Sequence, residues 1–242
     1  MTLLGDISMN KPLNDSDINA WTFYQAYYGK NLSYSDRQKK YTVNGTEISV
    51  NGDVCFNTKL KYQTRYSLLG SIIKEEPRFN ELNQLLSDLL YSPMNLSILP
   101  QTGGLNTIKK NFADDRLDSF VWLLNQYFAG VTAPIVNRGT KNSYISNQIL
   151  LKKFLDKFDK EKGFCLSFYG VPEEFVSKLV NNGKNAICTS SELYNYLKLA
   201  TEFWAIRLYE LRRRAILNPD ECNSYEAEIT KLNTLLDNLI TQ

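Results

Sequence analysis

The last 54 residues carry an apolar pattern that constrains the fold more strongly than any other part of the chain. Apolar residues recur at steps of four and three over 193–215, and Thr189 with Glu192 gives a capping-box signature just before them. Residues 218–220, Asn-Pro-Asp, force a turn, after which the pattern resumes over 225–239. The segment therefore predicts two antiparallel helices joined by a short turn, with a coiled-coil-like seam between them.

The two predicted arms of this hairpin carry opposite charge. Residues 189–217 include five basic and three acidic side chains, whereas 218–242 include one basic and five acidic side chains. These signs favour pairing of the arms with each other. We also expect the hairpin to be a contact arm for another macromolecule, most readily a protein, and a homodimer through it is a further hypothesis.

Short strands are expected in the first half of the chain. Two Asn-Gly pairs separate β-branched runs, which is typical of hairpins and predicts strands near 41–43, 46–50 and 53–56. The apolar run 94–99 has the length and composition of a buried strand. Residues 164–169, between two glycines, have a similar pattern and predict another strand.

Helical periodicity dominates the rest of the sequence. Helices are expected over 18–28, 64–74, 77–92, 117–129, 145–158 and 172–180. Asp114 is expected to cap the fourth of them. The predicted fold class is α+β, predominantly helical, with a small antiparallel hairpin or sheet and the C-terminal antiparallel two-helix hairpin. We divide the chain into an α+β domain, 1–188, and a helical hairpin, 189–242, that packs on it, and we expect one domain overall.

The chain contains no histidine, which excludes several kinds of catalytic and metal site. Without imidazole there is no Ser-His-Asp or Cys-His nucleophile system and no histidine-bearing zinc site. The four cysteines are far apart in the sequence, so no C-x-x-C pair is present either. We therefore predict no metal and no cofactor, and an enzyme is the less favoured class.

Charge and hydropathy point to a cytosolic protein. The formal net charge is +2, so nucleic acid or a charged membrane could be bound only through a local patch. The first residues lack a basic stretch followed by an apolar one, and no window approaches 18 apolar residues. We expect a cytoplasmic location with reduced thiols and no membrane partner.

An acidic cluster, Asp114-Asp115-Arg116-Leu117-Asp118, opens one predicted helix and is the first candidate site. Asp115 and Asp118 are three positions apart and share a helix face, so together they could bind Mg²⁺ or act as acid and base, with Arg116 beside them. A metal ion would need more oxygen ligands than this segment supplies. The competing interpretation is structural, because acidic side chains favour the positive end of a helix and Arg116 can pair with one of them.

A basic cluster near the end of the long predicted helix is the second candidate. It consists of Arg207, Arg212, Arg213 and Arg214. These guanidinium groups could bind phosphate, or they could face acidic partners such as Glu210 and the final helix. The lysines of 152–162 form a further basic segment, for which a solvated helix face is the favoured interpretation.

Two other features allow both a functional and a structural interpretation. Gly103-Gly104 could cradle a phosphate, but the Gly-Lys-Ser/Thr of a P-loop is absent, which favours a turn leading into the next element. The predicted helix 18–28 carries five aromatic residues, which could stack on bases or sugars. Packing of these aromatics within the fold is favoured, since they surround the helix and no basic cluster accompanies them.

Several motifs together resemble a bacterial family known only as a domain of unknown function. The motifs are Leu96-Ser-Ile-Leu-Pro100, Leu105-Asn106-Thr107, Asp115-Arg116-Leu117-Asp118, Tyr127, Tyr196, Phe203, Arg207 and Arg212 to Ile216. In that family an apolar strand ending in proline precedes an Asp-Arg-aromatic-Asp helix that closes with His-Tyr, and here Gln126 replaces the histidine. The resemblance covers most of 15–217. It implies no activity, but it implies that Arg116, Asp118 and the Arg207–Arg214 region matter together.

The leading functional hypothesis is a non-enzymatic, cytosolic bacterial protein that binds a macromolecule, with phage or mobile-element origin as part of it. The first alternative is a small enzyme that acts on a phosphorylated ligand through Asp115, Asp118 and Arg116. The second alternative is a nucleic-acid-binding protein that uses Arg212 to Arg214 and the lysines of 152–162.

Overall fold

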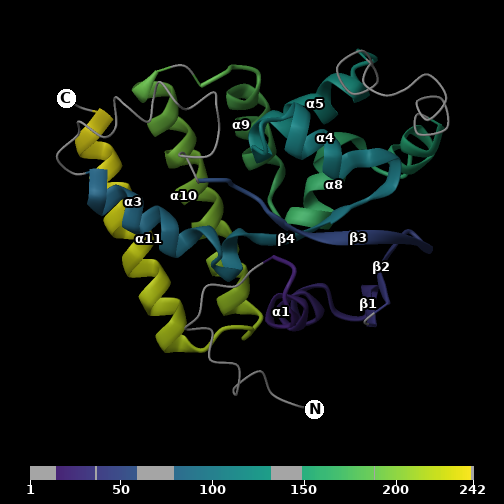
Figure 1. Ribbon diagram of the computed structural model, residues 1–242, viewed down its shortest axis with the longest axis horizontal. Coiled ribbons are helices and arrows are strands. Elements are labelled where there is room, and N and C mark those ends of the chain that lie inside the picture. The colour runs from purple at the N-terminus through teal and green to yellow at the C-terminus, as the bar shows by residue number, and fades with distance from the viewer. Residues whose placement is uncertain (1–14, 36, 59–78, 132–148, 188, 241–242) are drawn as a thin grey trace. The chain divides into compact units, whose positions relative to one another are not determined.

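The computed structural model confirms the predicted fold class, since helices predominate and a single four-stranded sheet accompanies them in the part that it describes (Figure 1). The described residues are 15–35, 37–58, 79–131, 149–187 and 189–240. They form two compact units. The first unit takes in Met1–Phe23, Phe56–Leu96 and Ala186–Gln242, and the second takes in Tyr24–Cys55 and Ser97–Asn185. The chain thus passes between units several times. The division predicted from the sequence, 1–188 and 189–242, follows different boundaries and stays a prediction.

The sheet follows the order β1-β2-β3-β4. β1 (Leu32–Ser35), β2 (Gln38–Val43) and β3 (Thr46–Val54) are antiparallel neighbours, and β4 (Leu96–Pro100) lies next to β3. Asn44 and Gly45 connect β2 to β3 with φ of 47° and 75°, which confirms the first predicted hairpin turn.

The second Asn-Gly pair does not form the predicted turn. β3 continues through Asn51 and Gly52 as one strand, so the predicted break between 46–50 and 53–56 is wrong. Contacts with the residue after β4 keep the backbone extended here. The Gln101 N–H donates to Ser49 O at 3.0 Å, and Gln101 Nε2 donates to Asn51 Oδ1 at 2.5 Å. Strand pairing therefore overrides the local turn preference.

Helices supply most of the second unit. They are η2 (Gly29–Asn31), η6 (Thr102–Gly104), α4 (Leu105–Phe112), α5 (Leu117–Phe128), α8 (Lys160–Tyr169), α9 (Glu173–Gly183) and a helix over 149–155. α5 packs against α4, α8 and α9. The predicted strand 164–169 is wrong, because these residues belong to α8. Phe164 and Phe168 lie four positions apart and are both buried, so this short apolar run fits one helix face as well as a strand.

Two helix ends also differ from the expectation. Arg116, not Asp114, is the N-cap residue of α5, while Asp114 and Asp115 have φ of 55° and 56° and form the tight link from α4. α9 continues through Asn181-Asn182 to Gly183, which packs on the backbone of Asp118. A Cβ at position 183 would lie 2.0 Å from Asp118 O, so only glycine fits this contact between α9 and α5.

The first unit contains the predicted helical hairpin, formed by α10 (Ser190–Arg213) and α11 (Pro219–Ile240), which lie side by side (Figure 1). Thr189 and Glu192 form the predicted capping box. Arg212 Nη2 lies 2.7 Å from Glu226 Oε2, and Lys198 Nζ lies 2.6 Å from Asp237 Oδ1, so the oppositely charged arms do pair.

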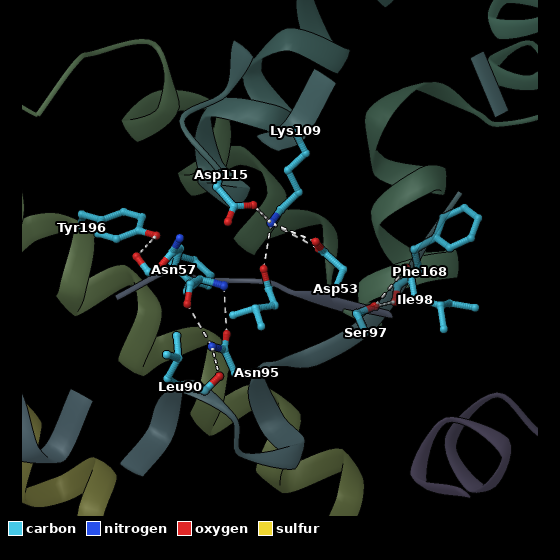
Figure 2. A network of polar contacts seen from close by, with 12 residues as sticks. Asp53, Asn57, Leu90, Asn95, Ser97, Ile98, Lys109, Asp115, Phe168 and Tyr196 are labelled. Atoms are coloured by element: carbon cyan, nitrogen blue, oxygen red, sulfur yellow. Dashed lines mark hydrogen bonds and ion pairs between the residues drawn. The ribbon is translucent and has the colours of Figure 1, made fainter. Parts of the chain in front are cut away.

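The apolar seam of this hairpin is covered within its own unit. α11 packs on α3 (Phe79–Leu90), and α10 packs on η5 (Pro93–Asn95). Leu208 and Leu211 of α10 are buried. The side-chain amide of Asn95 is fully hydrogen-bonded within this core (Figure 2). Its Nδ2 donates to Phe56 O and Leu90 O, and its Oδ1 accepts from Phe56 N, at 2.8–2.9 Å. The homodimer through the hairpin stays a prediction. Among the described residues, α3 and η5 cover the seam, so it leaves no apolar face free for a second copy.

α1 (Ile18–Tyr28) matches the predicted helix, and the chain passes from the first unit to the second within it. Its five aromatic side chains are all at most 8 % exposed. This burial agrees with packing within the fold rather than with a stacking platform. The expected helix 64–74, the first residues of the expected helices 77–92 and 145–158, and Cys188 lie outside the described residues. Among the helices described, none is both long and apolar enough to cross a membrane.

Candidate functional site

Arg116 and Asp118 form a buried ion pair that joins α5 to α9. Arg116 Nε and Nη2 donate to the two oxygens of Asp118 at 3.1 and 2.5 Å, and both residues are at most 1 % exposed. Asn182 Nδ2 donates to Asp118 Oδ2 at 2.7 Å, and Arg116 Nη1 donates to Asn185 O at 3.1 Å. The Asp118 carboxylate is thus occupied by three donors from two residues, and this arrangement is typical of a structural pair.

Asp115 points to a different cation, Lys109 of α4. Lys109 Nζ lies 3.2 Å from Asp115 Oδ1, 3.2 Å from both oxygens of Asp53, and 2.7 Å from Val54 O (Figure 2). The Lys109 side chain is fully buried and Asp53 is 1 % exposed, whereas the Asp115 side chain is 26 % exposed. This Lys109 cluster, meaning Lys109 with Asp53 and Asp115, ties α4 to β3.

The protonation states follow from burial and pairing. Burial raises the pKa of Asp53 to about 6, although the Lys109 ammonium acts in the opposite direction. Burial alone lowers the pKa of Lys109, but the carboxylates of Asp53 and Asp115 outweigh it and hold that pKa above its usual value. Lys109 therefore stays an ammonium ion at neutral pH, a state that makes it a poor nucleophile.

The two predicted catalytic carboxylates are consequently engaged by different cations, Asp115 by Lys109 and Asp118 by Arg116. Over the described ranges, no group of three or more histidine, cysteine, aspartate or glutamate side chains could hold a metal ion. The arrangement can stabilise two helix contacts. It offers no carboxylate pair that shares a space open to a substrate.

The predicted phosphate-binding arginines lie in the first unit, each beside specific partners. Arg207 is buried; its Nη2 donates to Leu96 O at 2.6 Å and its guanidinium lies 5.9 Å from the centre of the Phe203 ring. Arg213 Nη2 lies 2.8 Å and Arg214 Nε 3.5 Å from Glu210 Oε2. The hydrogen bond from Arg213 lowers the pKa of Glu210. Arg212 pairs with Glu226. The three exposed arginines thus all contact acidic side chains, which agrees with the interpretation that they face Glu210 and the final helix.

A groove that sequence reasoning missed lies in the second unit. It is an open groove of about 870 Å³, lined by three segments: 40–51 of β2 and β3, the turn 101–104 with the start of α4, and 150–157. Among the described residues, its charged lining consists of Lys40, Lys153, Lys157 and one acidic residue, Glu47. We call this the large groove.

One end of the large groove is closed by contacts between two of these segments. Lys157 Nζ donates to Thr46 Oγ1 at 2.5 Å, and Asn44 Nδ2 donates to Lys157 O at 2.9 Å. On another wall, Gly103 and Gly104 adopt φ of 63° and 78°. A Cβ at Gly103 would lie 2.6 Å from Leu151 Cβ, so glycine allows the turn to pack directly on the helix 149–155.

Lys40 and Lys153 differ from the arginines of α10, because neither forms an ion pair within the described ranges. The adjacent Lys152, by contrast, pairs with Asp156 at 3.1 Å. Asn51, Gln101 and Asn106 add side-chain amides to the lining. The signals available in the sequence were the lysines of 152–162 and the glycine pair, but their convergence depends on the tertiary fold.

Comparison of the chain with protein-family models, with curated proteins and with solved structures found no significant match. The resemblance to the family of unknown function therefore stays a prediction. Of the residues that it connects, Arg116 and Asp118 lie in the second unit, whereas Arg207 to Arg214 lie in the first.

Proposed function

We propose that this protein is a non-enzymatic binding protein that holds a phosphate-bearing ligand in the large groove of its second unit. The observation that carries the proposal is a groove of about 870 Å³ whose described lining holds three lysines and a single carboxylate. We also propose that the protein is cytosolic and bacterial and that it comes from a phage or mobile element, as expected from the sequence.

The charge of the lining favours an anionic ligand. Lys40 and Lys153 present ammonium groups that form no ion pair within the described residues, and Glu47 is the one carboxylate of the described lining. A bound phosphate would supply negative charge to both lysines and accept charge-assisted hydrogen bonds from them. The start of α4 meets the groove at Asn106 and Thr107, and the partial positive charge of a helix amino end adds to the same field.

The neutral donors of the lining suit phosphate oxygens as well. Amide groups of Asn51 and Gln101 and hydroxyl groups of Ser49 and Thr102 surround the lysines. Phosphate oxygens accept several hydrogen bonds at once, so a mixed set of ammonium, amide and hydroxyl donors is chemically suited to them. The volume lies within the range of ordinary ligand sites.

The alternative of an enzyme acting through Asp115, Arg116 and Asp118 receives no support from their contacts. Asp115 is paired with Lys109, and Asp118 is paired with Arg116. Lys109, Arg116 and Asp118 are each at most 1 % exposed. The Lys109 cluster supports the groove instead, because Asp53 belongs to β3 and Lys109 to α4, and both elements contribute to its lining.

A pair of charge reversals at adjacent positions tests the proposal. Isothermal titration with inorganic tripolyphosphate is measured for the unaltered protein, for Lys153→Glu and for Lys152→Glu. Both variants change the net charge equally, but only Lys153 lines the groove. We expect about tenfold or greater loss of affinity for Lys153→Glu and little change for Lys152→Glu. Equal losses in the two variants, or no binding by the unaltered protein, would contradict the proposal.

A further inference from the structure

A second, smaller groove continues the large one along the sheet. It encloses about 340 Å³ and is lined by residues of 37–40 and 49–51 together with Gln101. The two grooves share Lys40, Ser49, Asn51 and Gln101. They are therefore neighbouring parts of one hollow that follows β2 and β3 from the strand ends toward the helix 149–155.

The cations are spread over the full extent of this hollow. Arg37 and Lys39 line only the small groove, Lys40 lines both, and Lys153 and Lys157 line only the large one. Lys39 and Lys40 are adjacent on β2, so their side chains point to opposite faces of the sheet, and Lys39 shares the face of the buried Tyr41. Without Lys39, the described lining holds four cations and one carboxylate, Glu47, which gives a net charge of +3. A ligand with one phosphate can reach only one part of this series, whereas a chain of phosphates can reach all of it.

We infer that the ligand is a single strand of nucleic acid, which runs through both grooves and is held by its backbone phosphates. This inference rests on the proposed function and specifies its ligand. A strand carries one negative charge per nucleotide, which matches a row of cations better than a compact anion does.

The shape of the hollow favours one strand over two. The lining is concave, and two contacts hold its segments together: the β2–β3 turn is linked to the chain at Lys157, and the turn at Gly103 packs on Leu151. A duplex presents a wide convex surface and keeps its base faces stacked inside. Leu150, on the lining, is 51 % exposed and offers apolar contact to a sugar or a base face, which only an unpaired strand makes available.

The lining also predicts weak sequence preference. Among the described residues of the lining, the one aromatic side chain is Phe154, and it is 2 % exposed, so it provides no ring face on which a base could stack. Recognition would thus depend on phosphate contacts, which do not distinguish one base sequence from another.

Fluorescence anisotropy with the full chain tests this inference. The probe is a labelled oligothymidylate of about 15 nucleotides, a length within the range of single-strand sites. The competitors are the matched duplex, inorganic tripolyphosphate and oligoglutamate. We expect the strand to bind at least about tenfold more tightly than each competitor. We expect the logarithm of the association constant to fall with the logarithm of salt concentration with a slope of about −3, from about four phosphate contacts.

Variants at the two ends of the hollow show whether one strand spans both grooves. Arg37→Gln in the small groove and Lys153→Gln in the large groove should each reduce the salt slope by about 0.7, while Lys152→Gln leaves it unchanged. Circular dichroism and thermal unfolding check that each variant is folded.

The outcomes separate the inference from the proposed function. If the duplex or oligoglutamate binds as tightly as the strand, or if Arg37→Gln has no effect, the inference is overturned while phosphate binding at Lys153 can still stand. If tripolyphosphate depends on Lys153 but the strand binds no more tightly, the ligand is a compact phosphate and the inference is again wrong. If no anionic probe binds, both fail.

Discussion

The basic end of α10 and the lysine-lined groove of the second unit contain similar numbers of cations but differ in what surrounds them. Arg212, Arg213 and Arg214 each lie within 3.5 Å of a glutamate oxygen. Lys40 and Lys153 line a hollow and have no acidic partner among the described residues. The position of a cation in the sequence therefore says little about binding until its neighbours in space are known.

A third set of charges, the Lys109 cluster, completes this comparison. There the cation is fully buried and contacts two carboxylates and a backbone carbonyl. Charges of this kind act on stability, because removing one partner leaves the other buried without compensation. Charges on the groove lining should act on binding instead.

The largest expected effect is at Lys109. Lys109→Met leaves Asp53 buried without its cation, and we expect the free energy of unfolding to fall by about 3–5 kcal/mol. Urea denaturation measures the change, and Lys110→Met, at an exposed neighbouring position, is the control. Adding Asp53→Asn should restore part of the loss. A single variant as stable as the control would show that the Lys109 cluster contributes nothing to stability.

We expect a smaller effect from the titration of Asp53, which should make the free energy of unfolding depend on pH. Its pKa in the folded protein is about 6, above the ordinary value of 3.8, so the folded state binds the proton more tightly than the unfolded state. The contribution of Asp53 to stability is therefore fully present below pH of about 4 and is lost as the pH rises to about 6, by about 2–3 kcal/mol. Unfolding curves from pH 4 to 7 should show this decrease in the unaltered protein and not in Asp53→Asn. Parallel curves for the two proteins would contradict it.

Regular patterns made much of the fold predictable. The hairpin could be predicted because its apolar spacing extends over many turns and because Thr189 and Glu192 mark its start. The strand expected at 164–169 was wrong because a six-residue apolar run has no decisive period, and the position of Phe164 and Phe168 on α8 depends on packing. Asn51-Gly52 was misread because the contacts of Gln101 come from a distant part of the chain.

The candidate site was less predictable for a related reason. Clustering along the chain made Asp115, Arg116, Asp118 and the arginines of α10 the candidates in the sequence. The groove instead combines Lys40, Gln101 and Lys153, which are separated by more than 50 positions. Only the tertiary fold brings them together, and only the tertiary fold distinguishes Lys153 from its paired neighbour Lys152.

Two double variants that remove the same charge distinguish binding by the groove lysines from binding by the paired arginines. Affinity for the labelled oligothymidylate is measured for Lys40→Gln with Lys153→Gln, and for Arg212→Gln with Arg213→Gln. We predict at least about a tenfold loss, or about 1.4 kcal/mol, for the lysine pair and less than about twofold for the arginine pair. Loss of binding in the arginine variant, with binding retained in the lysine variant, would contradict the account.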